Sequence, residues 1–189
     1  MFIRDRHEDL STMGITIIWD HQVPVGLRLP VARRVEMILG MPVSNADAAA
    51  LINGYHPERS QYDAAAILER VLLMKNRAGC TGPVLLIVTH DLFVGGCDFV
   101  FGLARPQTGC AVISTARLDN RFYGRPEDFN DLADRAAKEG SHELGHLFGL
   151  EHCTDRECVM FKPATLAELD RKKMALCPDC RRRLGKHST

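Results

Sequence analysis

Short apolar runs alternate with amphipathic segments along the first half of the chain. Residues 15–19 form a β-rich apolar run that predicts a strand. The segment from Pro30 to Gly40 repeats apolar residues at helical spacing, with proline at a permitted first-turn position and glycine at its end. A weak strand is expected over residues 42–45, and a second amphipathic helix over residues 63–76. This alternation is typical of an α/β domain.

Three further strands and a long helix are expected in the second half. Residues 84–89 are an unbroken apolar run, which favours a central strand buried on both faces. Two more strands are expected over residues 98–104 and 110–115, separated by a turn that contains Pro and Gly. A long helix is expected over residues 126–148. The order βαβαβββα predicts an α/β sheet domain followed by a smaller C-terminal part.

Two segments outside this regular pattern complete the outline. Residues 55–60 are expected to form a loop. Thr165 and Glu168 have the spacing of a capping box, which predicts the start of the last helix. Residues 150–189 are rich in Cys, Lys and Arg, so we expect them to form a small metal-bound subdomain.

The composition is that of an ordinary globular domain. The chain has 189 residues, 46% of them hydrophobic and 25% charged, which is enough to bury a core. We expect a single domain over residues 1–189, with an N-terminal subdomain (13–149), a C-terminal subdomain (150–189) and an extension without function at residues 1–12. The formal net charge of zero gives no general attraction to nucleic acid or to anionic membranes. A monomer is expected.

The N-terminus is charged and lacks the apolar stretch of a secretory signal. The longest apolar run, residues 84–88, is far too short to span a bilayer, so a cytoplasmic protein is expected. Because cytosolic thiols stay reduced, clustered cysteines are interpreted as metal ligands before disulfides. Cys80, Cys97 and Cys110 lie in or beside predicted strands and are expected to be buried thiols.

The strongest chemical signal is the run His142-Glu-Leu-Gly-His146-Leu-Phe-Gly149-Leu-Glu-His152. On a helix, residues four apart share a face, so His142 and His146 can hold one metal ion. Gly149 can take a left-handed conformation that ends the helix and turns His152 back to the same ion. Glu143 lies beside the metal, where it can take a proton from the attacking water as a general base. Three neutral ligands and one open position are typical of catalytic zinc.

Several alternatives stay open around this motif. A surface helix could carry the histidines by chance, although the added glycine and third histidine make that rare. Imidazole also suits iron and nickel. Tyr123 could reach a developing oxyanion or simply pack before the long helix, and His90 and Asp91, which follow the central strand, are expected to be structural.

Four cysteines form a second candidate metal site. Cys153 follows His152 directly, Cys158 comes five residues later, and Cys177 and Cys180 form a Cys-x-x-Cys pair. This spacing fits a closed four-thiolate zinc site with a net charge of about −2, and disulfides are the alternative. Flanking bases would offset that charge or lie in solvent: Arg171, Lys172, Lys173, Arg181, Arg182 and Arg183.

These motifs resemble those of the archaemetzincins, a family of metzincin zinc metallopeptidases. The resemblance rests on the histidine motif with the adjoining Cys153, on Cys158-x-Met160 and on Cys177-x-x-Cys180. Looser matches lie upstream: Asp91-Leu-Phe, Phe99-Val-Phe-Gly102, residues 111–114, Arg117-Leu118 and Phe122-Tyr-Gly124. Sixteen residues separate Met160 from Cys177, one fewer than in the family pattern, and a change of one residue in a connecting segment leaves the ligand set intact.

The resemblance implies a metzincin-like α/β (α+β) fold. Such a fold has a twisted, mostly parallel sheet with an antiparallel edge strand, a long active-site helix and a small C-terminal zinc-bound subdomain. It implies two zinc ions per chain, a catalytic ion on the three histidines and a structural ion on the four cysteines. It also implies that Met160 is the Met-turn residue beneath the catalytic ion, for which the alternative is an ordinary core methionine.

The expected function is zinc-dependent hydrolysis of peptide bonds in a peptide or protein substrate, with Glu143 as general base. An extended peptide could add as a further strand beside residues 99–104. Two other functions are compatible with the motifs: a non-catalytic, zinc-stabilised peptide-binding module, and a small-molecule amidase with a closed pocket. Nucleic-acid binding by the basic C-terminus is a more distant alternative.

Overall fold

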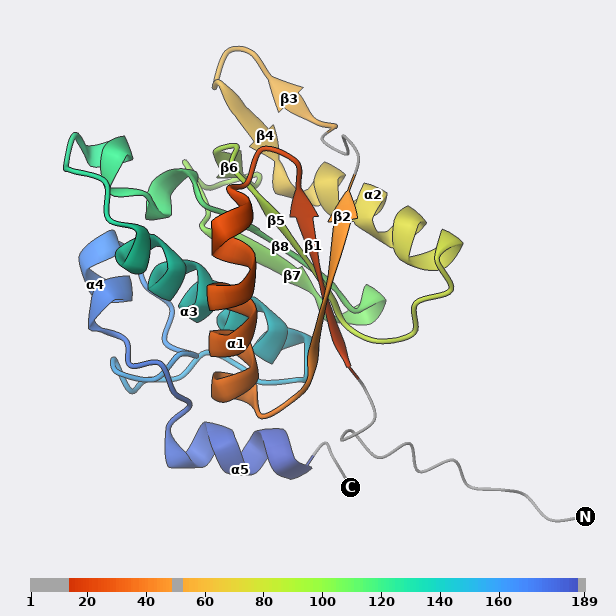
Figure 1. Cartoon of the computed structure of the whole chain (residues 1–189), viewed down its shortest axis with the longest axis vertical. Helices are drawn as coiled ribbons and strands as arrows, with labels where there is room; N and C mark the ends of the chain where they lie inside the picture. The colour runs from red at the N-terminus through yellow and green to blue at the C-terminus, as the bar shows by residue number, and fades with distance from the viewer. Residues whose placement is uncertain (1–13, 49–52, 187–189) are drawn as a thin grey trace, which may run out of the picture.

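A five-stranded sheet, in the order β2-β1-β5-β8-β7, forms the centre of the protein (Figure 1). The computed structural model describes residues 14–48 and 53–186, and the expected extension at residues 1–12 lies outside them. The strands of this sheet are β1 (Ile15–Asp20), β2 (Val43–Ala48), β5 (Val84–Val88), β7 (Gly102–Arg105) and β8 (Cys110–Ser114). Neighbouring strands run parallel, except that β7 is antiparallel to β8 at the edge. The expected sheet is therefore confirmed.

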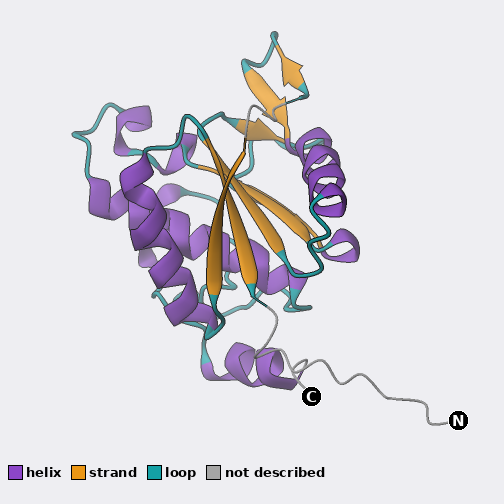
Figure 2. Ribbon diagram, turned by 45° about the vertical axis from the view of Figure 1, so that its right-hand side comes forward, coloured by secondary structure: helices purple, strands orange, loops and turns teal. Residues whose placement is uncertain are grey.

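Helices cover both faces of the twisted sheet (Figure 2). α1 (Arg28–Leu39) and α3 (Phe129–Leu147) pack on one face, and α2 (Ala64–Arg77) packs on the other. Alternation along β1 explains this division, because Ile15 and Ile17 join the core with α1 and α3 while Ile18 joins the core with α2. All five residues of β5 are buried, as expected for a central parallel strand.

Local side-chain bonds set the ends of the helices. Asp128 accepts hydrogen bonds from the backbone N–H groups of Asn130 and Asp131, so α3 begins at Phe129 and not at residue 126. α1 begins at Arg28, two residues before Pro30, because a short 3₁₀ turn (Val25–Leu27) leads into it. Its end at Gly40, in the left-handed conformation (φ 74°), is as predicted.

A small second sheet was not predicted. It consists of β3 (Tyr55–His56), β4 (Gln61–Asp63) and β6 (Leu92–Phe93), in the order β3-β4-β6. The expectation of a loop over residues 55–60 was therefore wrong in part. Strands of two or three residues are too short to show periodicity, and β4 pairs with β6 from a distant part of the chain.

The strand expected over residues 98–104 is shorter and later than predicted, since β7 covers Gly102–Arg105. The carbonyl oxygen of Asp98 accepts hydrogen bonds from the side chains of Arg59 and Gln61. The Asp98 carbonyl is thus bonded to side chains and not to a neighbouring strand. The segment before β7 is irregular, and it forms a wall of the cavity described below.

The C-terminal part contains two helices, α4 (Leu166–Arg171) and α5 (Pro178–Lys186). The capping box forms as predicted: Thr165 accepts from the N–H of Glu168, and the Glu168 carboxylate accepts from the N–H of Ala164. The helix that it opens is not the last, because α5 follows. Leu166, Leu169 and Leu184 join the same core as α1 and α3.

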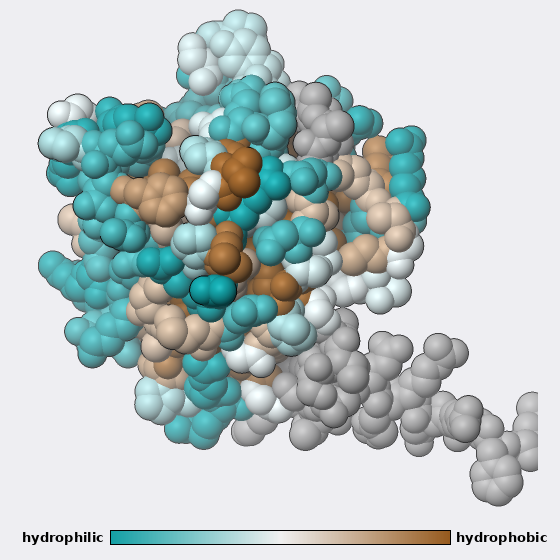
Figure 3. Space-filling model, viewed as in Figure 1, coloured by the Kyte–Doolittle hydropathy of each residue, from teal (hydrophilic) through white to brown (hydrophobic). Residues whose placement is uncertain are grey.

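Hydrophilic side chains predominate on the face seen in Figure 3, where the hydrophobic ones lie in small separate groups. The large aliphatic side chains lie instead in the two cores on either side of the sheet. In the described ranges, no helix is both long enough and apolar enough to cross a membrane.

Candidate metal centre and active site

The structure brings together the three histidines of the sequence motif. His142 and His146 lie one turn apart on α3, and Gly149, with φ of 80°, turns the chain so that His152 returns to them. One ligand atom from each residue lies within 4.8 Å of the other two. The left-handed turn predicted at Gly149 is therefore present, and it brings the third imidazole to the first two.

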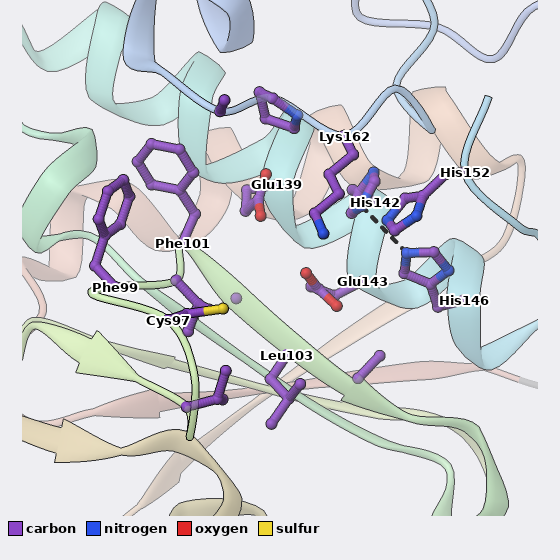
Figure 4. A pocket seen from close by; sticks show the side chains of 16 residues that line it. Cys97, Phe99, Phe101, Leu103, Glu139, His142, Glu143, His146, His152 and Lys162 are labelled. Atoms are coloured by element: carbon purple, nitrogen blue, oxygen red, sulfur yellow. Dashed lines mark hydrogen bonds between the residues drawn. The ribbon is translucent and has the colours of Figure 1, made fainter. Parts of the chain in front are cut away.

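Backbone carbonyls orient two of these rings. The Nδ1–H of His142 donates to the carbonyl oxygen of Val159 at 2.9 Å, and that of His146 donates to Leu150 at 2.8 Å. This leaves the Nε2 lone pairs facing each other, 3.2 Å apart, as marked in Figure 4. Lone pairs at that distance repel unless a cation lies beside both, so the donor set fits a shared metal ion.

The histidines are held in the form that binds a metal. Burial lowers the pKa of His142 well below its ordinary value and also lowers the pKa values of His146 and His152. Neutral imidazoles are the required ligands. The site has three nitrogen donors, and one of its ligands, His152, is exposed to solvent. This matches an open zinc site better than a closed structural site.

A cavity of about 460 Å³ opens beside the histidines and contains Glu143 (Figure 4). Its other walls come from the segment before β7, from β7 itself and from the loop of residues 162–164. Burial raises the pKa of Glu143 well above its ordinary value, and the neighbouring Glu139 raises it further. A carboxylate in such surroundings is a stronger proton acceptor than one in water.

Gly102 determines how closely the edge strand approaches this carboxylate. A Cβ atom added at Gly102 would lie 2.8 Å from Cγ and 2.9 Å from Oε1 of Glu143. Only glycine therefore allows β7 to pass beside the glutamate without displacing it. Glycine within a strand indicates a close approach of this kind, but the sequence does not say which group approaches.

Met160 is fully buried, and its side chain lies against α3 at Gly145. A Cβ atom at Gly145, the residue before His146, would collide with its sulfur. The glycine between the first two histidines thus makes room for the methionine. The role of Met-turn residue, which the family resemblance implies for Met160, stays a prediction.

Lys172 is a buried cation behind the site, with only 2% of its surface exposed. Its ammonium has no hydrogen-bond partner in the described residues, and neither has Oε2 of the buried Glu139. The positive charge of Lys172 lowers the pKa values of Glu139 and Glu143, opposing the effect of burial. This lysine was expected to offset the charge of the cysteines or to lie in solvent. It is buried, and its charge interacts with the two carboxylates and with Cys158.

The four clustered cysteines also converge. Their sulfur atoms lie within 4.8 Å of one another. Backbone N–H groups point at these sulfurs, from Met160 and Cys177 to Cys158 and from Cys180 to Cys177. Such donors stabilise thiolates, and four convergent sulfurs fit a closed tetrahedral zinc site. No disulfide joins the described cysteines.

Other candidates lie away from the centre or differ from expectation. Tyr123 donates to the carbonyl oxygen of Arg117 and does not line the cavity. Asp91 is structural, as predicted, and holds Arg117 through two hydrogen bonds. Cys110 is buried as predicted and Cys80 is only partly buried. Cys97 is exposed and lines the cavity, so its predicted burial was wrong. Its segment is part of the irregular wall before β7.

The fold and the histidine site define a metzincin-like zinc metallopeptidase. The profile of Peptidase family M54 matches residues 19–186. A protein of Thermococcus kodakarensis described as "Archaemetzincin" is 38% identical over 148 residues, covering 77% of this chain and 79% of that protein. The chain belongs to the archaemetzincin family, peptidase family M54.

Solved structures agree with this assignment. The crystal structure of a zinc-dependent peptidase from Methanocorpusculum labreanum superposes with a TM-score of 0.88 at 40% identity, covering 90% of this chain and 100% of that one. The archaemetzincin of Methanopyrus kandleri gives a TM-score of 0.78 at 32% identity, covering 99% and 98% of the two chains. The expected family and fold are confirmed.

Proposed function

We propose that this peptidase cleaves peptide bonds at a zinc ion held by His142, His146 and His152, with Glu143 as general base. The observation that carries the proposal is the convergence of three oriented imidazoles and one buried carboxylate in a single cavity. Cys153, Cys158, Cys177 and Cys180 would hold a second, structural zinc ion. Met160 would support the histidine site from below.

The free edge of β7 supports an extended peptide as substrate. β7 is the last strand of its sheet, and its outer edge borders the cavity beside Glu143. A peptide can add there as a further strand, with main-chain hydrogen bonds to β7. Its scissile bond would then pass between the strand edge and α3.

A bound zinc ion supplies a Lewis acid that polarises the scissile carbonyl and makes the attacking water more acidic. Glu143 accepts the proton of that water and then delivers it to the leaving amine. Gly102 keeps the glutamate in its position beside the strand, and Lys172 partly offsets the carboxylate charge from behind.

Two alternatives fit these features less well. A non-catalytic binding module has no use for a buried carboxylate beside an open ligand set. A small-molecule amidase favours an enclosed pocket, whereas this cavity is bordered by an unpaired strand edge.

Glu143→Gln tests the assignment. The amide keeps the shape of the side chain but cannot accept a proton, so hydrolysis of a peptide library should fall by about 100- to 10,000-fold. Zinc content should stay unchanged, because Glu143 is not a ligand. Glu58→Gln, an exposed change in the β3–β4 hairpin, is the control. Wild-type turnover in Glu143→Gln would remove the residue from the mechanism.

A further inference from the structure

The loop after Met160 places a lysine in the cavity. Lys162 is exposed, and Figure 4 shows its side chain reaching into the cavity on the side of Glu143 and His152. It is the one Lys or Arg among the described residues that line this cavity. Within the described part of the chain, its ammonium makes no hydrogen bond or ion pair.

No carboxylate among the described residues forms an ion pair with Lys162. Glu139 and Glu143 line the same cavity, but both are buried and Lys172 partly offsets their charge from behind. Much of the remaining wall is apolar and includes Val94, Phe99, Phe101 and Leu103. Because the Lys162 ammonium makes no hydrogen bond or ion pair within the described residues and much of the wall is apolar, it is a ready partner for a negative charge on a ligand.

Lys162 is also close to the proposed catalytic ion. Lys162 and His152 line the same cavity (Figure 4). A zinc ion and the ammonium would then both place positive charge at one end of the cavity. A negatively charged group of the substrate, bound between them, would be attracted by both.

We propose that Lys162 selects substrates with an aspartate or glutamate side chain beside the bond to be cut. The proposal rests on the peptide cleavage proposed above and names its substrate class. A side-chain carboxylate suits this lysine better than the developing oxyanion does. Oxyanion donors are rigid and pre-oriented, whereas Lys162 is an exposed ammonium on a flexible stem.

Paired peptides test this selection. Internally quenched peptides that differ only by Glu or Gln at each position flanking the scissile bond would be compared by kcat/KM. The wild-type enzyme should prefer Glu at one position by roughly three- to tenfold. Lys162→Met should remove the preference, and Lys162→Glu should reverse it in favour of the Gln peptide. Arg77→Met, an equal loss of charge at the end of α2 on the other face of the sheet, should keep it.

A binding measurement separates this proposal from the catalytic mechanism. Zinc-loaded Glu143→Gln would be titrated calorimetrically with the same peptides, with and without Lys162→Met. The Glu peptide should bind more tightly by the same ratio, and the ratio should shrink as salt screens the ammonium.

The outcomes are distinct. If Glu143→Gln still cuts peptides, the proposed mechanism fails while the Glu/Gln ratio still decides the role of Lys162. Equal treatment of Glu and Gln peptides by the wild-type enzyme would overturn the selection. The selection is also overturned if Lys162→Met lowers turnover of both peptides equally and leaves their ratio unchanged.

Discussion

The two ligand clusters of this protein differ in how much of each faces solvent. His152 is exposed and the histidine cluster opens on a cavity, whereas Cys158 and Cys180 are 1% and 6% exposed. An open ligand set leaves room for a substrate, and a closed one can only stabilise the fold. This difference agrees with the proposed roles, a catalytic ion at the histidines and a structural ion at the cysteines.

The two clusters are nevertheless linked through one short segment. His152 and Cys153 are consecutive, so their Cα atoms are only about 3.8 Å apart. The N–H of Cys153 donates to the carbonyl oxygen of Met160. Val159, which follows Cys158, accepts the hydrogen bond that orients His142. The cysteine cluster therefore holds the groups that position the histidine cluster.

Metal removal should show the largest difference between the clusters. We expect two zinc ions per fully loaded chain, and a chelator should take the ion at the histidines first because that site is open. All peptidase activity should disappear at that stage, while the fold survives until the second ion leaves. Elemental analysis, activity and circular dichroism along a chelator time course measure this order. Simultaneous loss of both ions would contradict the contrast between open and closed sites.

Cys177→Ser should break the closed cluster and weaken the open one. Loss of one thiolate destabilises the C-terminal part, and Val159 and His152 then lose their anchor. Zinc affinity at the histidines should fall by about 10- to 100-fold, the usual effect of disturbing groups that orient ligands.

Zinc titration of Cys177→Ser, followed by activity recovery, tests this coupling. Cys80→Ser, a cysteine outside the cluster, is the matched control. Unchanged affinity at the histidines would show that the cysteine cluster is an independent appendage.

Gly102→Ala should damage the open site and spare the closed one. The added methyl group collides with Glu143, so the carboxylate must move. Activity should fall by about 10- to 100-fold, since small misplacements of reacting groups cost this much. Gly95→Ala, where a Cβ atom meets nothing within 4 Å, is the control. Full activity together with an intact fold in Gly102→Ala would refute the steric argument.

Gly145→Ala should have the smallest effect, because the side chain that it meets is flexible. Its methyl group pushes Met160 away from the histidines, which should destabilise the protein by about 1–3 kcal/mol through overpacking. Denaturant unfolding measures the change. Gly185→Ala, a helical position with open space around it, should change stability little. If both substitutions lowered the free energy of unfolding equally, the cause would be the change in the helix backbone and not the contact with Met160.

The sequence by itself predicted the features that depend on local spacing. The histidines, the Gly149 turn, the Cys-x-x-Cys pair and the Thr165 cap each lie within about three helical turns, where backbone geometry relates spacing to position. The apolar runs of β1 and β5 predicted two strands of the main sheet for the same reason.

Only the tertiary structure decided which distant groups meet. Gly102 approaches Glu143, Lys172 lies behind two carboxylates, and Cys97 lines the cavity, although each looked ordinary in the sequence. The β3-β4-β6 sheet was missed because its pairing is non-local and its strands are too short to show a pattern. Such contacts depend on how whole elements pack, and that information is distributed over the chain and not contained in any one motif.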